Sequence, residues 1–246
     1  MPGPLGTASG IVSRGLPQPA PDLTYRESRF GRYGSQIVEP LFATKHAVCD
    51  EGSYFTAADS AGRATAAAPT AFSDTVPLAA ILNTDVASNP AAKRIYLDYL
   101  RAVETAAGTA GTSFFLRVEL DVIARYTSGG TTINGSNSNQ DSGVKSVGQL
   151  IVLPTTSAIT ASGRTITSNA CVLPTLTAPI AVGSEWAAYF GGDGAKFFAA
   201  STTFGWAGSS LAPLVIGPQQ AIVFPFQITL QSAASSWQLE AGWWER

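Results

Sequence analysis

The amino-acid sequence predicts an all-β protein, and two observations lead to this prediction. From Leu41 onwards, short segments that alternate apolar and polar residues recur between turn-forming residues. Over the same length, no segment shows a strong helical period. About eight to ten strands are expected, and their number and spacing favour a β-sandwich, of the jelly-roll type, over a barrel.

Residues 1–40 differ from the rest and are expected to form an extended N-terminal arm on a sandwich of residues 41–246. The first 22 residues hold five prolines, which favour an extended backbone and show no apolar periodicity. Residues 1–34 carry four arginines against Asp22 and Glu27, a net charge of +2, so the remainder carries −4 of the total of −2.

Arginines and aromatic residues alternate near the end of this arm. Such a segment offers forked donors to carboxylates and flat surfaces for stacking, which indicates docking on a partner. The alternative is a disordered tail with incidental charges. The candidate contact residues are Tyr25, Arg26, Arg29, Phe30, Arg32 and Tyr33.

The sandwich is expected to begin with an alternating segment at Phe42–Val48. Residues 57–71 are rich in alanine, with Gly62 and Pro69, and are predicted to form a loop. A short apolar run follows at Val76–Leu82.

Ile95–Glu104 fits either a strand or a helix, because its apolar residues match both periods. We favour a strand, since Phe114–Val122 alternates cleanly and Ala106–Thr112 has the length of a hairpin loop. This hairpin would place Glu104 opposite Arg117.

The second half of the chain adds a polar loop at Tyr126–Gly143 and several further strands. A last hairpin is expected between Ile222–Leu230 and Trp237–Trp243. Alternation turns Trp243 into the core and Trp244 outward, so we predict Trp244 to be an interface anchor. The strands between are Val147–Leu153, Arg164–Leu173, Glu185–Phe190 and Lys196–Phe204.

The histidine and cysteine content argues against an enzyme. His46 is the one histidine in 246 residues, and Cys49 follows it at a spacing that turns the two side chains to opposite faces of a strand. No G-x-S-x-G motif is present. Cys49 and Cys171 could pair only if the fold brings them together. The simpler expectation is two free thiols, and no catalytic residue is assigned.

No cofactor or metal is expected. Asn137–Gly143 resembles a calcium loop only faintly, because Gly148 stands where an EF-hand carries its closing glutamate. Phosphate-binding glycine motifs are missing from the sequence. A glycosidase would need two carboxylates across a cleft, and Asp98, Glu104, Glu119 and Asp121 are the candidates, although a cross-strand ion pair is the simpler interpretation.

The charge balance bears on partners. A net charge of −2 gives no electrostatic reason to bind nucleic acid. No apolar run approaches the roughly 18 residues of a membrane span, and the first residues lack the apolar core of a signal peptide. Charged residues are only 13% of the chain, against about 25% in ordinary soluble domains, which suits a subunit of a larger assembly.

Several stretches resemble those of virion structural proteins of tailed bacteriophages, over about residues 75–246. The resemblance implies a capsid decoration, or cement, protein of the jelly-roll type, without enzyme activity. The stretches are Asn89-Pro90, Lys93–Tyr99, Thr105–Ser113, Leu120-Asp121, Arg125–Thr131, Ile216-Gly217-Pro218, Ser236-Trp237 and Gly242–Arg246.

From this resemblance we expect a homotrimer, made in the host cytoplasm, on the outer capsid surface. Its partner would be the major capsid protein, whose neighbouring subunits it would bridge. The alternative is a receptor- or glycan-binding tail protein of similar fold.

Overall fold

The computed structural model describes residues 44–65, 68, 70–110, 113–121, 125–153, 158–160, 165–173, 179–191, 194–198, 205–207 and 211–246. These residues form β-strands and a single short helix, α1 (Thr44–Asp50). The chain divides into two compact units, residues 1–47 and 48–246, and the sandwich lies in the second. The predicted arm, with its six candidate contact residues, lies outside the described residues.

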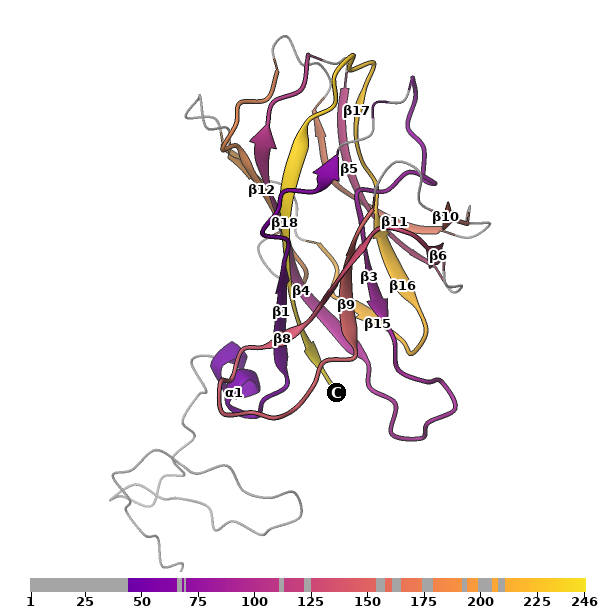
Figure 1. Cartoon of the computed structure of the whole chain (residues 1–246), viewed down its shortest axis with the longest axis vertical. Helices are drawn as coiled ribbons and strands as arrows, with labels where there is room; N and C mark the ends of the chain where they lie inside the picture. The colour runs from indigo at the N-terminus through magenta and orange to yellow at the C-terminus, as the bar shows by residue number, and fades with distance from the viewer. Residues whose placement is uncertain are drawn as a thin grey trace, which may run out of the picture. The chain divides into compact units, whose positions relative to one another are not determined.

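The larger of two antiparallel sheets has nine strands. Its order is β14-β13-β12-β4-β18-β1-β8, and β15 and β2 pair in addition with β4 and β18 (Figure 1). The strands are β1 (Tyr54–Ala58), β2 (Ala64–Thr65), β4 (Ile95–Ala106), β8 (Ser136–Asn137), β12 (Glu185–Tyr189), β13 (Gly194–Phe198), β14 (Gly205–Ala207), β15 (Leu214–Ile216) and β18 (Ser236–Glu245).

The smaller sheet has seven strands in the order β11-β5-β16-β3-β9-β7, with β17 also paired with β5. Strands β6 (Tyr126–Ser128) and β10 (Ala158–Ile159) form a separate two-stranded ribbon. The strands of the smaller sheet are β3 (Ala79–Asn83), β5 (Ser113–Asp121), β7 (Thr131–Asn134), β9 (Gly148–Val152), β11 (Thr165–Leu173), β16 (Ala221–Phe224) and β17 (Phe226–Thr229).

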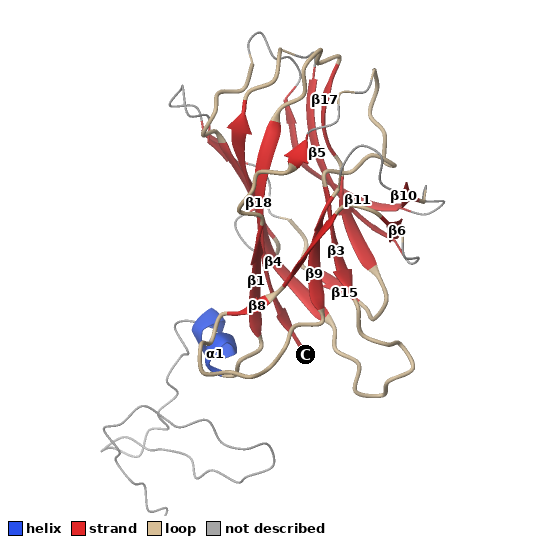
Figure 2. Ribbon diagram, in the orientation of Figure 1, coloured by secondary structure: helices blue, strands red, loops and turns tan. Residues whose placement is uncertain are grey.

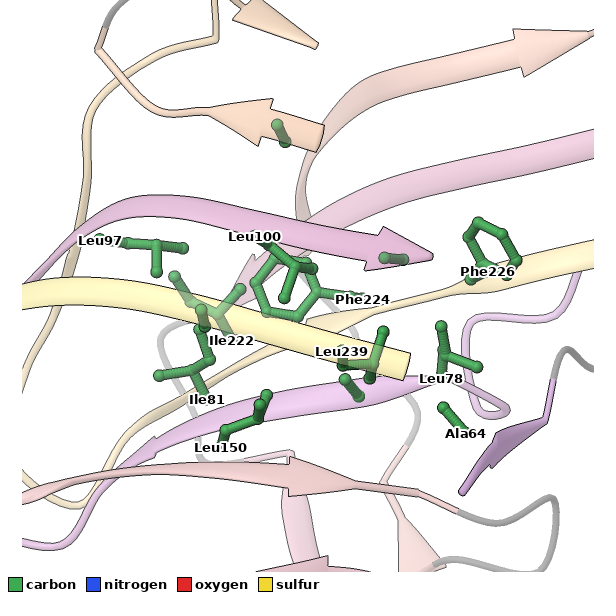
Figure 3. Packing of buried hydrophobic residues seen from close by; sticks show 14 of the residues in the cluster. Ala64, Leu78, Ile81, Leu97, Leu100, Leu150, Ile222, Phe224, Phe226 and Leu239 are labelled. Carbon is green, nitrogen blue, oxygen red and sulfur yellow. The ribbon is translucent and has the colours of Figure 1, made fainter. Parts of the chain in front are cut away.

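One main core of buried side chains comes from both sheets, whose strands are drawn red in Figure 2. Alternating residues of facing strands meet there, and the ring of Phe226 contacts that of Trp237 edge-on, with centroids 4.7 Å apart. The all-β sandwich is thus confirmed, and its jelly-roll connectivity stays a prediction. Figure 3 shows part of this core, including Ile81, Leu97, Leu100, Leu150, Ile222, Phe224 and Leu239.

Ile95–Ala106 is a strand, but the predicted hairpin with the following strand is wrong. β4 belongs to the larger sheet and β5 to the smaller one, so the connection crosses between the sheets. Glu104 is therefore not opposite Arg117; its partner across the ladder is Trp237. The same apolar alternation is expected for two strands that pair in one sheet and for two strands that face one another across the core. Alternation alone therefore does not identify which strands pair.

The predicted C-terminal hairpin is wrong for the same reason. β16 and β17 belong to the smaller sheet, where both pair with β5. β18 lies between β4 and β1 in the larger sheet. The chain changes sheet after β17, where Leu230 adopts a positive φ of 57°. The predicted apolar side of the last strand, β18, is nevertheless correct. All four of its residues are buried: Trp237, Leu239, Ala241 and Trp243.

Three local predictions also need correction. Phe42–Val48 was expected as a strand, but residues from Thr44 form α1. The predicted loop at residues 57–71 contains β2, and the predicted loop at Tyr126–Gly143 contains β6, β7 and β8. Alternation over seven residues also fits a short helix, and polar strands on a sheet edge lack the apolar signal that identifies a strand.

The outer face of the smaller sheet is covered by the β6–β10 ribbon. A second, small core forms there, with Tyr126 and Ile159 of the ribbon packed against it. Ala80, Ile151 and Val223 lie in one row across strands β9, β3 and β16 and are all buried. This part of the face, over β9, β3 and β16, is thus removed from water by the chain's own residues.

Candidate functional site

The outer face of the larger sheet carries a cluster of aromatic side chains. One row across four neighbouring strands consists of Val215, Tyr96, Trp244 and Tyr54. The rings of Tyr96 and Trp244 are parallel, with an interplanar angle of 1° and centroids 5.9 Å apart. Both side chains are half-buried. We call this outer surface of β12, β4, β18 and β1 the aromatic face.

A β-bulge in β4 extends the aromatic face. Gly242 pairs with Tyr99 and Trp243 with Leu97, so Asp98 is an extra residue without a partner in β18. The bulge shifts the alternation of β4. Leu97 and Leu100, which are three residues apart, consequently both lie in the core. Tyr99 consequently turns outward, next to Tyr189 of β12, with ring centroids 6.3 Å apart.

The phenol groups of this face are hydrogen-bonded to carboxylates. Tyr54 Oη donates to Asp98 Oδ2 at 2.6 Å, and Tyr99 Oη donates to Glu240 Oε1. Burial, reinforced by these hydrogen bonds, raises the pKa of both tyrosines above the ordinary value. Both therefore remain neutral donors over the physiological pH range.

Arg101 links two carboxylates in the next row. Its Nε and Nη2 donate to both oxygens of Glu185 at 2.8 and 2.9 Å, and its Nη1 lies 3.4 Å from Glu240 Oε2. The hydrogen bonds to Glu185 raise the pKa of Arg101, so the guanidinium stays charged. This network fixes side chains that are still 30–40% exposed.

Gly242 allows the rings to lie over β18. A Cβ atom at this position would be 2.3 Å from Cε1 of Tyr99 and 2.7 Å from Oη of Tyr54. Since neither ring has room to accept that atom, glycine is what permits the close approach. The tyrosines, their acceptors and Arg101 thus form one ordered surface.

The chemistry of the aromatic face suits binding. Tyrosine, tryptophan and arginine bury large area at small entropic cost and are enriched at the centres of protein interfaces. Ring surfaces beside fixed carboxylates also match the apolar faces and hydroxyl groups of sugars. Three carboxylates of this face, those of Asp98, Glu185 and Glu240, accept hydrogen bonds from Tyr54, Tyr99 and Arg101.

Trp244 lies on this face, as its alternation predicts, while its role as an interface anchor stays a prediction. Sequence reasoning missed Tyr99. Regular alternation puts Tyr99 on the same side as Leu97, and a bulge leaves no mark in an apolar pattern. It also missed Tyr96, Tyr189 and Arg101. Their common signal is that each alternates with core residues of its own strand.

Two of the four candidate catalytic carboxylates, Asp98 and Glu104, lie on the same strand but are not in contact through any described hydrogen bond. Asp98 hydrogen-bonds on the outer face, whereas Glu104 is buried with the core, and Glu119 and Asp121 lie on β5 of the other sheet.

His46 and Cys49 share helix α1, so the prediction that a strand separates their side chains is wrong. Cys49 is a free, half-buried thiol. Burial, and then the neighbouring Asp50, raises its pKa, which disfavours the nucleophilic thiolate. Cys171 lies on β11 of the smaller sheet.

The loop that faintly resembles a calcium site is held by its own hydrogen bonds. Asn137 Nδ2 donates to the carbonyl oxygens of Gly52 and Val144 and to Ser142 Oγ. Within the described ranges, no group of three or more His, Cys, Asp or Glu side chains is placed to hold a metal ion. In the same part of the chain, no helix is long and apolar enough to cross a membrane.

Comparisons of this chain with protein-family models, with curated proteins and with solved structures gave no match.

Proposed function

We propose that this protein is a non-enzymatic structural component that decorates and stabilises the capsid of a tailed bacteriophage. In this proposal it sits on the outer capsid surface and bridges neighbouring subunits of the major capsid protein, as a homotrimer. One observation carries the proposal: the aromatic face, an ordered surface of Tyr, Trp and Arg side chains that no described segment covers. The phage resemblance of the sequence supplies the partner.

The aromatic face has the composition of an interface centre. Trp244 and Tyr96 are parallel, half-buried rings that expose apolar surface at a fixed position, so little side-chain entropy is lost when they are covered. The low charge of the chain supports the same interpretation, because charged residues are depleted at the centres of protein interfaces.

The mechanism would be mechanical. Packaged DNA strains the joints between capsomers, and a trimer bound across a joint adds interface area that must be broken before the capsomers separate. The predicted arm would add a second contact through its arginines. Deleting residues 1–34 is therefore expected to weaken attachment and leave the melting temperature nearly unchanged.

Co-sedimentation with undecorated capsids tests the proposal. Trp244→Ala and Tyr96→Ala are expected to weaken binding about 10- to 30-fold each, the effect of removing an interface anchor. Val182→Ala is the matched control, because Val182 is 55% exposed and lies outside the aromatic face. Wild-type affinity of both aromatic variants would overturn the assignment of the face, and failure of the intact protein to bind any such capsid would overturn the function.

A second candidate is a receptor- or glycan-binding tail protein. The observation that favours it is that the parallel rings of Tyr96 and Trp244 share one face of the sheet with the carboxylates that Arg101 binds. Retention on a column of host-surface polysaccharide, lost in Trp244→Ala and kept in Val182→Ala, would support it. Absence of retention together with capsid binding would leave capsid decoration as the function.

A further inference from the structure

Glu104 is a buried carboxyl group that the aromatic face does not use. It alternates with Leu100 and Ala102 on the inner side of β4 and is 1% exposed. Its partner across the ladder is Trp237, whose ring packs on Phe226 of the opposite sheet. Neither carboxyl oxygen has a hydrogen-bond partner among the described residues. An ionised carboxylate in this position would be strongly unfavourable.

A clasp of hydrogen bonds closes the same corner of the sandwich. Thr109, in the loop after β4, is joined to the turn between β17 and β18. Its N–H donates to Ala233 O at 2.9 Å, and its Oγ1 accepts from the N–H groups of Ser232 and Ala233, each at 2.9 Å. Gln231 Nε2 donates to Thr109 O at 2.7 Å. We call this set of contacts the Thr109 clasp.

Gly108 connects the clasp with Glu104. A Cβ atom on Gly108 would lie 2.1 Å from Gln231 Nε2 and 2.5 Å from Ala233 O, so this residue is packed directly against the turn. Its N–H is also the one group that favours the ionised form of Glu104, without reaching hydrogen-bond geometry. Gln231 Oε1 is another buried oxygen without a partner. The clasp thus closes over a corner that holds three buried oxygens without a hydrogen-bond partner among the described residues.

No described charged side chain faces Glu104 from the elements around it. On β4 and β12, Arg101 and Glu185 pair with each other on the aromatic face. Beside β2, Arg63 pairs with Asp59. The residue of β18 next to Glu104 is the uncharged Trp237. The loop after β4 and the turn between β17 and β18 contribute the uncharged Gly108 and Gln231. Burial therefore dominates and raises the pKa of Glu104 to about 7.

We propose that Glu104 is a proton-controlled latch for the Thr109 clasp. With its proton, the neutral carboxylic acid tolerates the closed, dry corner. Without its proton, the carboxylate needs water, and the nearest way for water to enter is to break the clasp between the loop after β4 and the turn before β18. No other reactant is required, since the step is the release of one proton to solvent.

The direction of the pH dependence follows from linkage. In the open corner Glu104 has its ordinary pKa of 4.5, and in the closed corner the pKa is about 7. The closed state binds the proton more tightly, so closure is favoured at low pH and is weakened as the pH rises towards about 7. Between pH 5.5 and pH 8.5, the closing equilibrium is expected to fall about 30-fold.

Hydrogen exchange of the intact protein tests the latch. The reporters are the N–H groups of Thr109, Ser232 and Ala233, and the reference variant is Glu104→Gln, which cannot ionise. Relative to this variant at each pH, wild-type protection of the reporters is expected to fall about 30-fold between pH 5.5 and pH 8.5. The N–H groups of Val147 and Gly148, bound to Glu245 Oε1, serve as the remote control and should not change.

Two results would overturn the latch. One is an equal pH dependence of the reporters in wild type and Glu104→Gln, and the other is a parallel loss of protection at Val147 and Gly148, which would indicate general unfolding. Circular dichroism at pH 5.5 checks that the variant is folded. If it is not, Glu104→Leu replaces it as the reference variant, because leucine also lacks an ionisable group. Its reporter N–H groups are expected to show no latch-dependent change of protection with pH.

Discussion

The two outer faces of the sandwich are built differently. On the smaller sheet, Ala80, Ile151 and Val223 are buried beneath the β6–β10 ribbon, with Tyr126 and Ile159 packed against them. On the larger sheet, Tyr54 is buried, and the other outward positions hold Tyr96, Tyr99, Tyr189, Trp244 and the Arg101 network, which are partly exposed. Among the described residues, no segment covers this second face.

The difference indicates that one face contributes to the stability of the fold and the other to binding. Aliphatic residues under the ribbon have no polar atoms, and their contribution is to stability through burial. Tyrosine, tryptophan and arginine combine apolar area with donors, and side chains of this kind tolerate water until a partner arrives. We therefore expect substitutions on the covered face to change folding, and substitutions on the aromatic face to change binding.

The largest expected effect comes from Arg125, which holds the ribbon in place. Its side chain is 0% exposed, and it donates to Thr160 O at 3.1 Å and to Asp74 O at 2.7 Å, beside an ion pair with Asp74. Arg125→Ala removes these charge-assisted hydrogen bonds and is expected to cost about 3–4 kcal/mol in urea unfolding. Arg94→Ala, at an exposed position, is the control and should cost less than about 0.5 kcal/mol. Similar losses for both variants would contradict the role given to the ribbon.

A matched pair of truncations compares the faces directly. Ile151→Ala on the covered face is expected to lower the free energy of unfolding by about 2–3 kcal/mol, because it leaves a cavity under the ribbon. Tyr96→Ala on the aromatic face should cost about 1 kcal/mol, mostly the lost contact with Trp244. Chemical denaturation of both variants checks this order, and a larger loss for Tyr96→Ala would reverse the comparison.

The smallest expected change in stability comes from Arg101. Its ion pairs with Glu185 and Glu240 involve side chains that are 30–40% exposed, so solvent screens them. Arg101→Gln should alter the free energy of unfolding by less than about 1 kcal/mol and still weaken capsid binding, because Glu185 and Glu240 lose their common donor. A loss of stability as large as that of Ile151→Ala would show that the network supports the fold instead.

Much of the fold was predictable from alternation. The larger strands were found because one side of each is apolar over five or more residues, as in β11 and β18. Trp243 and Trp244 were assigned to opposite sides of β18 on this basis, and the structure buries the first and half-exposes the second. The two-residue strands β2 and β8 were missed, because they are too short to show a period.

Strand pairing was not predictable in the same way. A connection such as residues 106–112 has the length of a hairpin loop, yet it joins strands of opposite sheets, and the apolar pattern is the same in both arrangements. The bulge at Asp98 likewise leaves the composition of β4 unchanged while it reverses the side on which Tyr99 lies. Most of the aromatic face was therefore visible only in three dimensions.

The most direct measurement of the central claim is hydroxyl-radical footprinting of the protein, free and bound to undecorated capsids. Tyr96 and Trp244 report on the aromatic face, and Tyr126 of the ribbon reports on the opposite outer face. We predict that binding protects Tyr96 and Trp244 from oxidation and leaves Tyr126 unchanged. Oxidation of Tyr96 and Trp244 at the same rate in the free and capsid-bound protein would contradict the account.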